Sequence, residues 1–301
     1  MLLTDTRSWH RRWFLRNKDR DPQFESSSGM NTNTKDFNDQ KRWNDVYGGE
    51  FLEKLRESPE SFQVVESEQP PHKLFFLEQL PDVQGKRVLD LGCGQGELSI
   101  LLSRLGAKVT GVDLGEKLVE LSREVAMINH VDCDFDIANI TALPYEDESY
   151  DLVVGIGIIH HLPVEGLKAA VNESYRVLKP GGQAFFLEPI ENNKVFDFIQ
   201  NLIPVGTPDD PQYRPSILQR NRWKQFLAEE DDRTLTDEEL RKAGREFASV
   251  RFKYSQFLVR LCRIVPGKIV LRILQTFDLL LTNDYSPIRS LSRFTCVIYS
   301  K

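Results

Sequence analysis

The stretch VLDLGCGQG at residues 88–96 decides the fold of this chain. A short run of apolar residues enters a glycine-rich turn, and Glu97 then opens a segment in which leucines recur at helical spacing. A strand that runs through such a turn into a helix is typical of the carboxyl edge of a parallel sheet, where bare backbone lies against a nucleotide-like ligand. Taken alone, these glycines also fit a tight strand–helix corner that binds nothing.

Strand and helix patterns alternate downstream of this turn. We expect strands at 87–91, 108–113, 131–135, 150–156 and 183–187, and helices at 97–105, 116–127 and 165–178. Single helices between consecutive strands require right-handed crossovers and a parallel sheet covered on both faces. The sequence therefore predicts an α/β fold: a doubly wound, Rossmann-like, mostly parallel seven-stranded sheet with an N-terminal helical cap and a C-terminal helical insertion.

The N-terminal region differs in composition from the rest. Residues 1–35 interleave tryptophans with arginines before a polar stretch, and we interpret them as a disordered extension with Met30 as the working start. A targeting or membrane-surface segment is the alternative. Residues 36–80 carry an aromatic and charged helical pattern that includes Trp43 and Tyr47, which predicts a helical cap.

Residues 81–301 are predicted to form the main domain. Helical insertions are expected at about 193–245 and 256–290, with a helix cap at Thr236. Two further β-like segments, 247–254 and 294–299, flank an unusually apolar stretch at 258–281. We expect its apolar face, with Phe277, to turn inward over the substrate side of the sheet. Ordinary helix packing, a lid around a hydrophobic acceptor and contact with a membrane surface all remain open.

Bulk composition narrows the function classes. The chain has 301 residues, of which 40% are hydrophobic and 28% charged, and its formal net charge is −6. This balance suits a globular protein and gives no general attraction to nucleic acid. The four cysteines form no CxxC or Cys/His cluster, so we expect no metal and a reducing, cytoplasmic compartment. No apolar run is long enough to predict a membrane-spanning helix.

The spacing of the turn favours adenosine without a diphosphate. The glycines follow Gly-x-Gly-x-Gly, and Glu97 occupies the position at which a pyrophosphate-binding turn has glycine. Asp113 ends the next predicted strand, 21 residues after Gly92, where a carboxylate can accept hydrogen bonds from both ribose hydroxyls. A nicotinamide-dependent oxidoreductase, which would share the fold, is therefore disfavoured.

Four sequence blocks in order resemble the class I S-adenosylmethionine-dependent methyltransferases, in particular the small-molecule group related to ubiquinone and menaquinone methyltransferases. The blocks are VLDLGCGQG at 88–96, VTGVDL at 109–114, NITALPYEDESYDLVV at 139–154, and IIHHL at 158–162 with YRVLKPGG at 175–182. The resemblance covers about residues 86–190. It implies S-adenosylmethionine as cofactor and a small-molecule acceptor, which the apolar stretch at 258–281 predicts to be hydrophobic. Protein or tRNA methylation and non-catalytic cofactor binding are the alternatives.

The resemblance also implies roles for single residues. Asp90 would lie near the amino group of the cofactor, Asp113 on its ribose, and Asn139 on the adenine amino group, with Asp136 as a rival. Asn139 departs from the family, which usually has an acidic residue here. The other implied cofactor-binding residues line the methionine floor, the adenine and the transferring methyl group: Gly92, Gly94, Gly96, Leu114, Ile140, Gly157 and Ile158.

Three residues are candidates for catalysis. His160 and His161 follow the fourth predicted strand, and a histidine there could remove a proton from the acceptor. The alternative is that one packs under the following loop and the other caps it. Glu188 ends the fifth strand and is expected to face the substrate, where it would orient or deprotonate the acceptor. The reaction implied is in-line displacement at the methyl carbon, for which a base is needed only when the acceptor must lose a proton.

Overall fold

The computed structural model describes Asn44 and the ranges 48–190, 235–256, 273–274, 276–278 and 292–301, together with Leu258. The expectations for residues 1–35, for Trp43 and Tyr47, and for the part of the first helical insertion before residue 235 lie outside the described residues.

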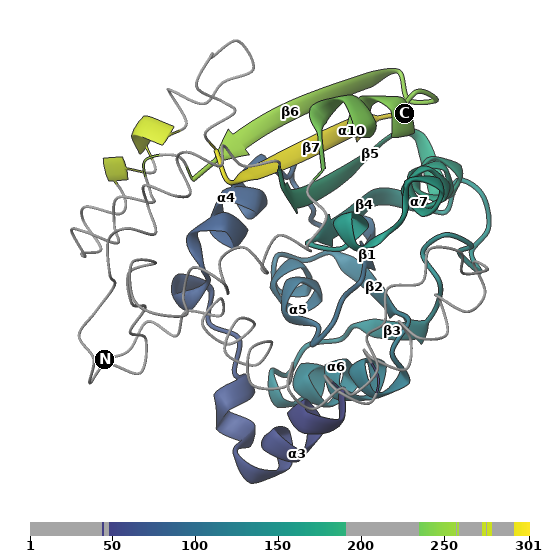
Figure 1. Ribbon diagram of the computed structural model, residues 1–301. Coiled ribbons are helices and arrows are strands. Elements are labelled where there is room, and N and C mark those ends of the chain that lie inside the picture. The colour runs from purple at the N-terminus through teal and green to yellow at the C-terminus, as the bar shows by residue number, and fades with distance from the viewer. Residues whose placement is uncertain are drawn as a thin grey trace, which may run out of the picture.

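Seven strands form one sheet in this described part (Figure 1): β1 Arg87–Leu91, β2 Lys108–Asp113, β3 Asp134–Ile137, β4 Tyr150–Ile156, β5 Leu178–Pro189, β6 Ser249–Ser255 and β7 Phe294–Ser300. Their order is β3-β2-β1-β4-β5-β7-β6. The strands from β1 to β5 pair in parallel, and β7 runs antiparallel to both β5 and β6. The strand order reverses between β1 and β4, which is where ligands bind in doubly wound sheets. The predicted fold class is confirmed.

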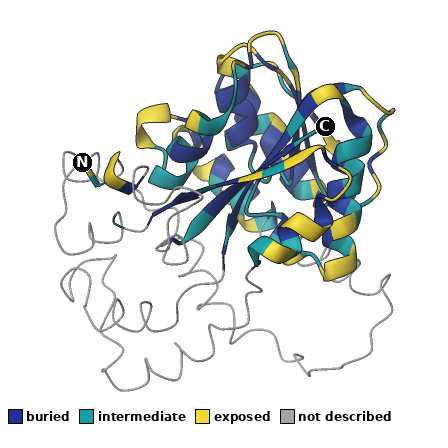
Figure 2. Ribbon diagram, turned by 90° about the horizontal axis from the view of Figure 1, so that it is seen from above, coloured by how far each residue is buried: buried dark blue, intermediate teal, exposed yellow. Residues whose placement is uncertain are grey.

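Helices cover both faces of this sheet: α3 Gly49–Glu57, α4 Pro71–Gln79, α5 Glu97–Arg104, α6 Glu116–Ile128, α7 Val164–Val177 and α10 Asp237–Ala243. Successive strand residues point to opposite faces, so Val88 packs with α4 and α5 while Leu89 packs in the cluster that contains α7 and α10. Buried residues concentrate in the strands and on the inward sides of these helices (Figure 2). The carboxyl edge of the parallel strands is thus held rigidly from two sides.

Most element positions follow the sequence pattern. The first, second and fourth strands have the predicted bounds, and the helices predicted at 97–105, 116–127 and 165–178 agree to within one residue at each end. The cap at Thr236 is also confirmed, because its hydroxyl accepts a hydrogen bond from the Glu239 amide while the Glu239 carboxylate accepts from the Thr236 amide.

The third strand was predicted at the wrong place. It begins at Asp134, where it pairs with Thr110 of β2, rather than at Val131. His130 adopts a positive φ of 55°, and the Val131 amide donates back to the Ala126 carbonyl. Val131 therefore closes the carboxyl end of α6, and the chain becomes free to pair only after it.

The inward orientation expected for Phe277 is wrong as well. Phe277 is 51% exposed, and Ile273, one helical turn before it, is 50% exposed. Asp278 is buried instead, and its carboxylate accepts a hydrogen bond from the Leu258 amide at 2.5 Å. A buried carboxylate needs such a donor, so this bond fixes which side of the segment faces inward.

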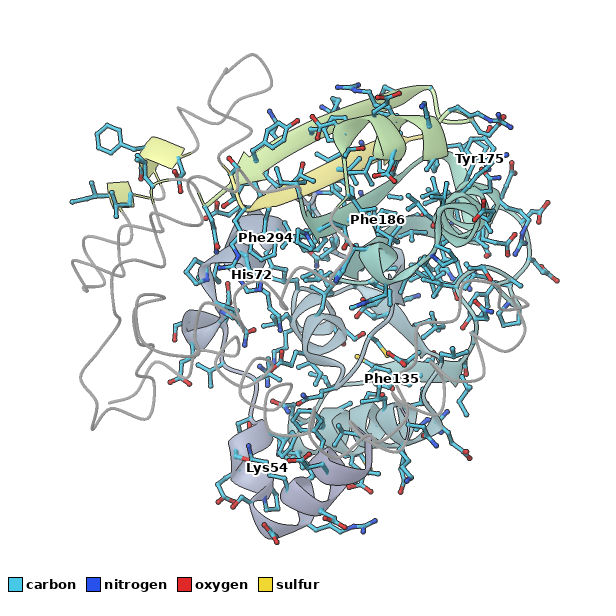
Figure 3. The ribbon with its side chains drawn as sticks, viewed as in Figure 1. Lys54, His72, Phe135, Tyr175, Phe186 and Phe294 are labelled. Atoms are coloured by element: carbon cyan, nitrogen blue, oxygen red, sulfur yellow. The ribbon has the colours of Figure 1, made fainter. Side chains whose placement is uncertain are left out.

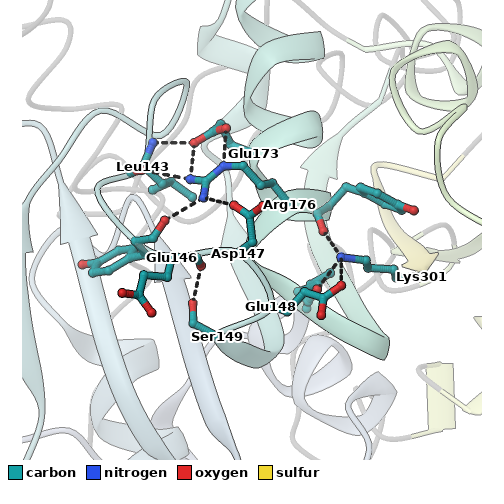
Figure 4. A network of polar contacts seen from close by, with 11 residues as sticks. Leu143, Glu146, Asp147, Glu148, Ser149, Glu173, Arg176 and Lys301 are labelled. Carbon is teal, nitrogen blue, oxygen red and sulfur yellow. Dashed lines mark hydrogen bonds and ion pairs between the residues drawn. The ribbon is translucent and has the colours of Figure 1, made fainter.

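A polar network joins the loop after β3 to α7 (Figure 4). Arg176 donates to the carbonyl oxygens of Leu143 at 2.9 Å and Tyr145 at 2.6 Å. It also pairs with Glu173 at 2.7 Å and Asp147 at 2.8 Å. One guanidinium thus holds a long connection that contains no helix of its own.

We predict that Arg176→Ala lowers the free energy of unfolding by about 2–3 kcal/mol, because two carbonyls and a half-buried carboxylate lose their donor. Arg245→Ala is the control, since its pair with Glu246 is exposed and is expected to contribute less than about 0.5 kcal/mol. Urea denaturation of both variants measures the difference. Equal losses would contradict the structural role given to Arg176.

Candidate active site

Three glycines shape the turn between β1 and α5. Gly92, Gly94 and Gly96 have φ values of 67°, 55° and 79°, a left-handed backbone that side chains disfavour. Repeated positive φ lets the chain reverse from strand to helix within a few residues. The sequence motif therefore sets this local path, and α5 starts directly behind it.

The surroundings of the three glycines differ. A Cβ on Gly92 would lie 2.5 Å from the Ile158 side chain, and one on Gly96 would lie 3.1 Å from Phe135, which Figure 3 labels. A Cβ on Gly94 would meet nothing within 4 Å. Gly92 and Gly96 are needed for packing, whereas Gly94 borders open space at the carboxyl edge of the sheet.

Asp113, at the end of β2, is bonded to this turn. One carboxylate oxygen accepts from the Gly94 amide at 3.0 Å, and the other accepts from the Gly115 amide at 2.9 Å. Burial raises the pKa of Asp113 although these backbone donors oppose the rise. The Leu114 amide is a third backbone donor to this carboxylate, which still has acceptor capacity for a hydroxyl donor beside Gly94. Leu114, the next residue, is half-buried.

Asp90 lies behind the turn on β1. It is 2% exposed and accepts a hydrogen bond from the Ser99 hydroxyl at 2.7 Å. Burial raises the pKa of Asp90 to about 7, against the effects of Ser99 and of the Lys73 ammonium. Lys73, on α4, forms an ion pair with Glu97 at the start of α5. The chain thus holds a carboxyl group that can change its charge near neutral pH.

The segment after β3 reaches the same edge, because the Ala138 amide donates to the Asp113 carbonyl. Asn139 follows, and its side-chain oxygen accepts from the amide and hydroxyl of Thr141 at 2.9 and 2.8 Å. Ile140 is buried. This Asx-type turn places Asn139 just after the end of β3, beside the end of β2 that carries Asp113.

Asp136 points elsewhere. It accepts a hydrogen bond from the Tyr145 hydroxyl at 2.8 Å, and both residues line a cavity of about 520 Å³ together with Arg87 and Thr110. The residues of the glycine turn are not part of that lining. Asp136 is thus engaged with Tyr145, as Asn139 is with Thr141, and the choice between the two residues stays a prediction.

The segment after β4 is held by Glu188. Gly157 takes a φ of 65°, and the amides of Ile158 and Ile159 donate to one Glu188 oxygen at 3.0 and 3.1 Å. The other oxygen lies 2.6 Å from Nδ1 of His160. Glu188 is fully buried. It was expected to face the acceptor directly, but both of its oxygens are directed to this segment.

The two histidines differ in environment. The His160 side chain is 12% exposed, and His161 is exposed. Their ring centroids are 3.9 Å apart. The short helix that carries both, η5 (Ile159–His161), lies at the carboxyl end of β4, so the histidines stand at the edge that also holds the glycine turn.

Sequence reasoning missed Ser99 and Lys73. Ser99 is a buried polar residue between Leu98 and Ile100 on α5, and a polar residue on an apolar helix face is the signal that could have found it. Lys73 gives no comparable signal, because its partner Glu97 lies on another element. On α4 beside it, His72 stacks on Phe294 with ring centroids 5.0 Å apart. Both residues are labelled in Figure 3.

A glycine turn open at one position, with a carboxylate from the neighbouring strand beside it, defines an α/β protein that binds a nucleoside at the carboxyl edge of its sheet. The described residues include no group of three or more His, Cys, Asp or Glu side chains that could hold a metal ion. No described helix is both long enough and apolar enough to cross a membrane.

Comparisons with known proteins identify the family. Residues 88–182 match the family model of a methyltransferase domain. The chain is 33% identical over 159 residues to the ubiquinone biosynthesis O-methyltransferase of Pseudomonas savastanoi pv. phaseolicola, which covers 49% of this chain and 67% of that protein. The protein of the same name from Coxiella burnetii is 32% identical over 156 residues, with 49% and 66% covered. The chain spans about two thirds of the length of these relatives.

A solved structure supports the fold assignment. Phosphoethanolamine N-methyltransferase 1 from Haemonchus contortus, 14% identical, superposes with a TM-score of 0.55 over 90% of this chain and 50% of that one. The chain belongs to the class I S-adenosylmethionine-dependent methyltransferases. The resemblance seen in the four sequence blocks is thereby confirmed.

The contact between Gly92 and Ile158 gives a prediction. Gly92→Ala would place a methyl group against the Ile158 side chain at a positive φ, and we expect it to cost about 2–4 kcal/mol of stability. In an Ile158→Ala background the same change should cost at least about 1 kcal/mol less, because the two closest atoms, Cδ1 and Cγ1, are removed and only Cβ remains, at 3.0 Å. Urea denaturation of the four proteins gives the coupling energy. Strict additivity would mean that the two segments do not touch.

Proposed function

We propose that this chain transfers a methyl group from S-adenosylmethionine to a hydroxyl group of a small, hydrophobic molecule. The observation that carries the proposal is the open space in front of Gly94, which the carboxylate of Asp113 borders. The relatives named as O-methyltransferases of ubiquinone biosynthesis support the choice of a small acceptor that is methylated on oxygen.

The cofactor fits the charges and shape of this site. Bare backbone at Gly94 leaves room for the methionine part, and the remaining acceptor capacity of Asp113 suits a ribose hydroxyl. Asp90, behind the turn, would balance the positive amino group. When bound, S-adenosylmethionine supplies a methyl carbon on a cationic sulfur.

The remaining proposed contacts surround the adenine and the reacting centre. Leu114, Asn139 and Ile140 lie at the ends of β2 and β3, where an adenine would extend from a ribose on Asp113. Gly157 and Ile158 would border the methyl group, since Ile158 already packs over Gly92. A pyrophosphate fits less well, because α5 begins with the negatively charged Glu97. The ion pair with Lys73 neutralises this charge but leaves no net positive charge for a phosphate.

The acceptor is proposed to be hydrophobic and not a nucleic acid. A net charge of −6 opposes the approach of a phosphate backbone. The half-exposed pair Ile273 and Phe277 offers apolar surface, which supports contact with a membrane surface or with a lipid-like acceptor.

Acceptor probes test this function. We expect methyl transfer from S-adenosylmethionine to catechol, with a lower KM for a catechol that carries a long alkyl chain, and no transfer to bulk tRNA or to a protein mixture. Formation of S-adenosylhomocysteine is the readout, with acceptor-free reactions as the blank. Methylation of tRNA or protein in place of the catechols would contradict the proposal.

Two matched valine substitutions test the cofactor position. Gly94→Val and Gly181→Val both place a β-branched residue at a positive φ in open space, and only the first lies at the proposed site. Both should lower the melting temperature similarly, since the backbone strain is alike. Calorimetry should show that only Gly94→Val loses S-adenosylhomocysteine binding. Equal affinity in the two variants would place the cofactor elsewhere.

A further inference from the structure

Glu188 makes three polar contacts with one short segment of chain. Its Oε1 accepts from the amides of Ile158 and Ile159 at 3.0 and 3.1 Å, and its Oε2 lies 2.6 Å from Nδ1 of His160. The residue has no exposed surface. A fully buried carboxylate with both oxygens engaged this way is built to hold the segment that follows β4.

The contact with Glu188 determines which nitrogen of the His160 imidazole carries the proton. An ionised carboxylate only accepts hydrogen bonds, so Nδ1 of His160 must be the donor. In the neutral ring the lone pair is then on Nε2, the nitrogen that points away from Glu188. The His160 side chain keeps 12% exposure while Glu188 has none, so the outward-facing part of this pair is the imidazole.

The same carboxylate links His160 to the proposed cofactor site. Ile158, which donates to Glu188, packs over Gly92 so closely that a Cβ there would lie 2.5 Å away. Only Ile159 separates Ile158 from His160, so the position of the ring follows from the contact with the glycine turn. Glu188 therefore fixes the cofactor floor and the imidazole in one arrangement.

In the described part of the chain, His161 and Tyr299 also interact with this pair. The exposed ring of His161 lies 3.9 Å from that of His160, centroid to centroid. Tyr299 on β7 donates its hydroxyl to the Leu240 carbonyl at 2.9 Å, and its pKa is raised first by burial and then by the Glu188 charge. Burial therefore favours a neutral Tyr299 beside the Glu188 carboxylate, which leaves His160 as the group that the carboxylate can direct.

We propose that Glu188 is a positioning residue, which holds His160 in the tautomer whose Nε2 accepts the proton of an acceptor hydroxyl. The proposal rests on the methyl-transfer function proposed above. As the hydroxyl oxygen bonds to the methyl carbon, its proton moves to Nε2, and the electron pair of the broken carbon–sulfur bond stays on sulfur. The proton then leaves His160 for solvent.

This arrangement favours hydroxyl acceptors over amines. A hydroxyl oxygen is a weak nucleophile until it loses its proton, so a base aligned with it accelerates the reaction. A neutral amine attacks first and can release its proton afterwards. A fixed and partly shielded Nε2 lone pair is therefore most useful for phenols, enols or alcohols.

Histidine tautomers, read by long-range ¹H–¹⁵N correlation spectra of the full-length protein at pH 8, test the proposal without any acceptor. The chain has five histidines, and His160→Asn assigns the signal. We expect a protonated Nδ1 and an unprotonated Nε2. In Glu188→Gln the amide oxygen can keep the two backbone donors only if its NH₂ group donates to Nδ1, which forces the proton onto Nε2. Glu165→Gln, an exposed carboxylate on α7, is the control and should change nothing.

Kinetics complete the test. With catechol as the acceptor probe, Glu188→Gln should lower kcat by about 10²–10⁴-fold, as loss of a general base does, while S-adenosylhomocysteine affinity changes less than about threefold. A wild-type spectrum with the proton on Nε2, or a Glu188→Gln protein with unchanged tautomer and kcat, would overturn the proposal. If the wild type bound no S-adenosylhomocysteine, the proposed function would fail, and the spectrum would still decide the role of Glu188. If Glu188→Gln did not fold, the wild-type tautomer together with the kcat of His160→Asn would decide.

Discussion

The hydrogen bond from the Gly94 amide to the Asp113 carboxylate joins the ends of two parallel strands, and the rest of the site depends on it. The strand β1 turns into α5 through backbone that only glycine adopts readily, and such backbone needs a fixed partner. Asp113 provides that partner from β2, and its second oxygen holds the Gly115 amide that precedes α6. One half-buried carboxylate thereby sets where both helices begin. The space left open in front of Gly94 follows from this geometry.

A second carboxylate performs the same task on the other side of the strand-order reversal. Glu188 ends β5 and holds the segment that leaves β4, and Ile158 of that segment rests on Gly92. The edge of the sheet from β2 to β5 therefore has a carboxylate bonded to backbone amides at each end, half-buried at Asp113 and fully buried at Glu188. Rigid placement of this kind suits in-line transfer, because small errors in alignment slow such reactions strongly.

The sequence predicted the fold well because local patterns specify it. Glycines, apolar runs and leucine spacing are enough to locate β1, β2 and β4, and the cap at Thr236 is a local motif. Contacts between residues far apart in the sequence determine the features that the local patterns did not predict. The start of β3 depends on how α6 closes at Val131, and the role of Glu188 depends on its partners in the segment after β4. Phe277 was misplaced because Asp278 is bonded to Leu258, twenty positions away.

The central claim is that the turn at Gly94 binds the nucleoside of S-adenosylmethionine without a diphosphate. Calorimetric titration of the full-length protein with S-adenosylhomocysteine and, separately, with NAD tests it most directly. The account predicts saturable 1:1 binding of S-adenosylhomocysteine and no measurable heat with NAD at the same concentrations. Tighter binding of NAD than of S-adenosylhomocysteine would contradict it.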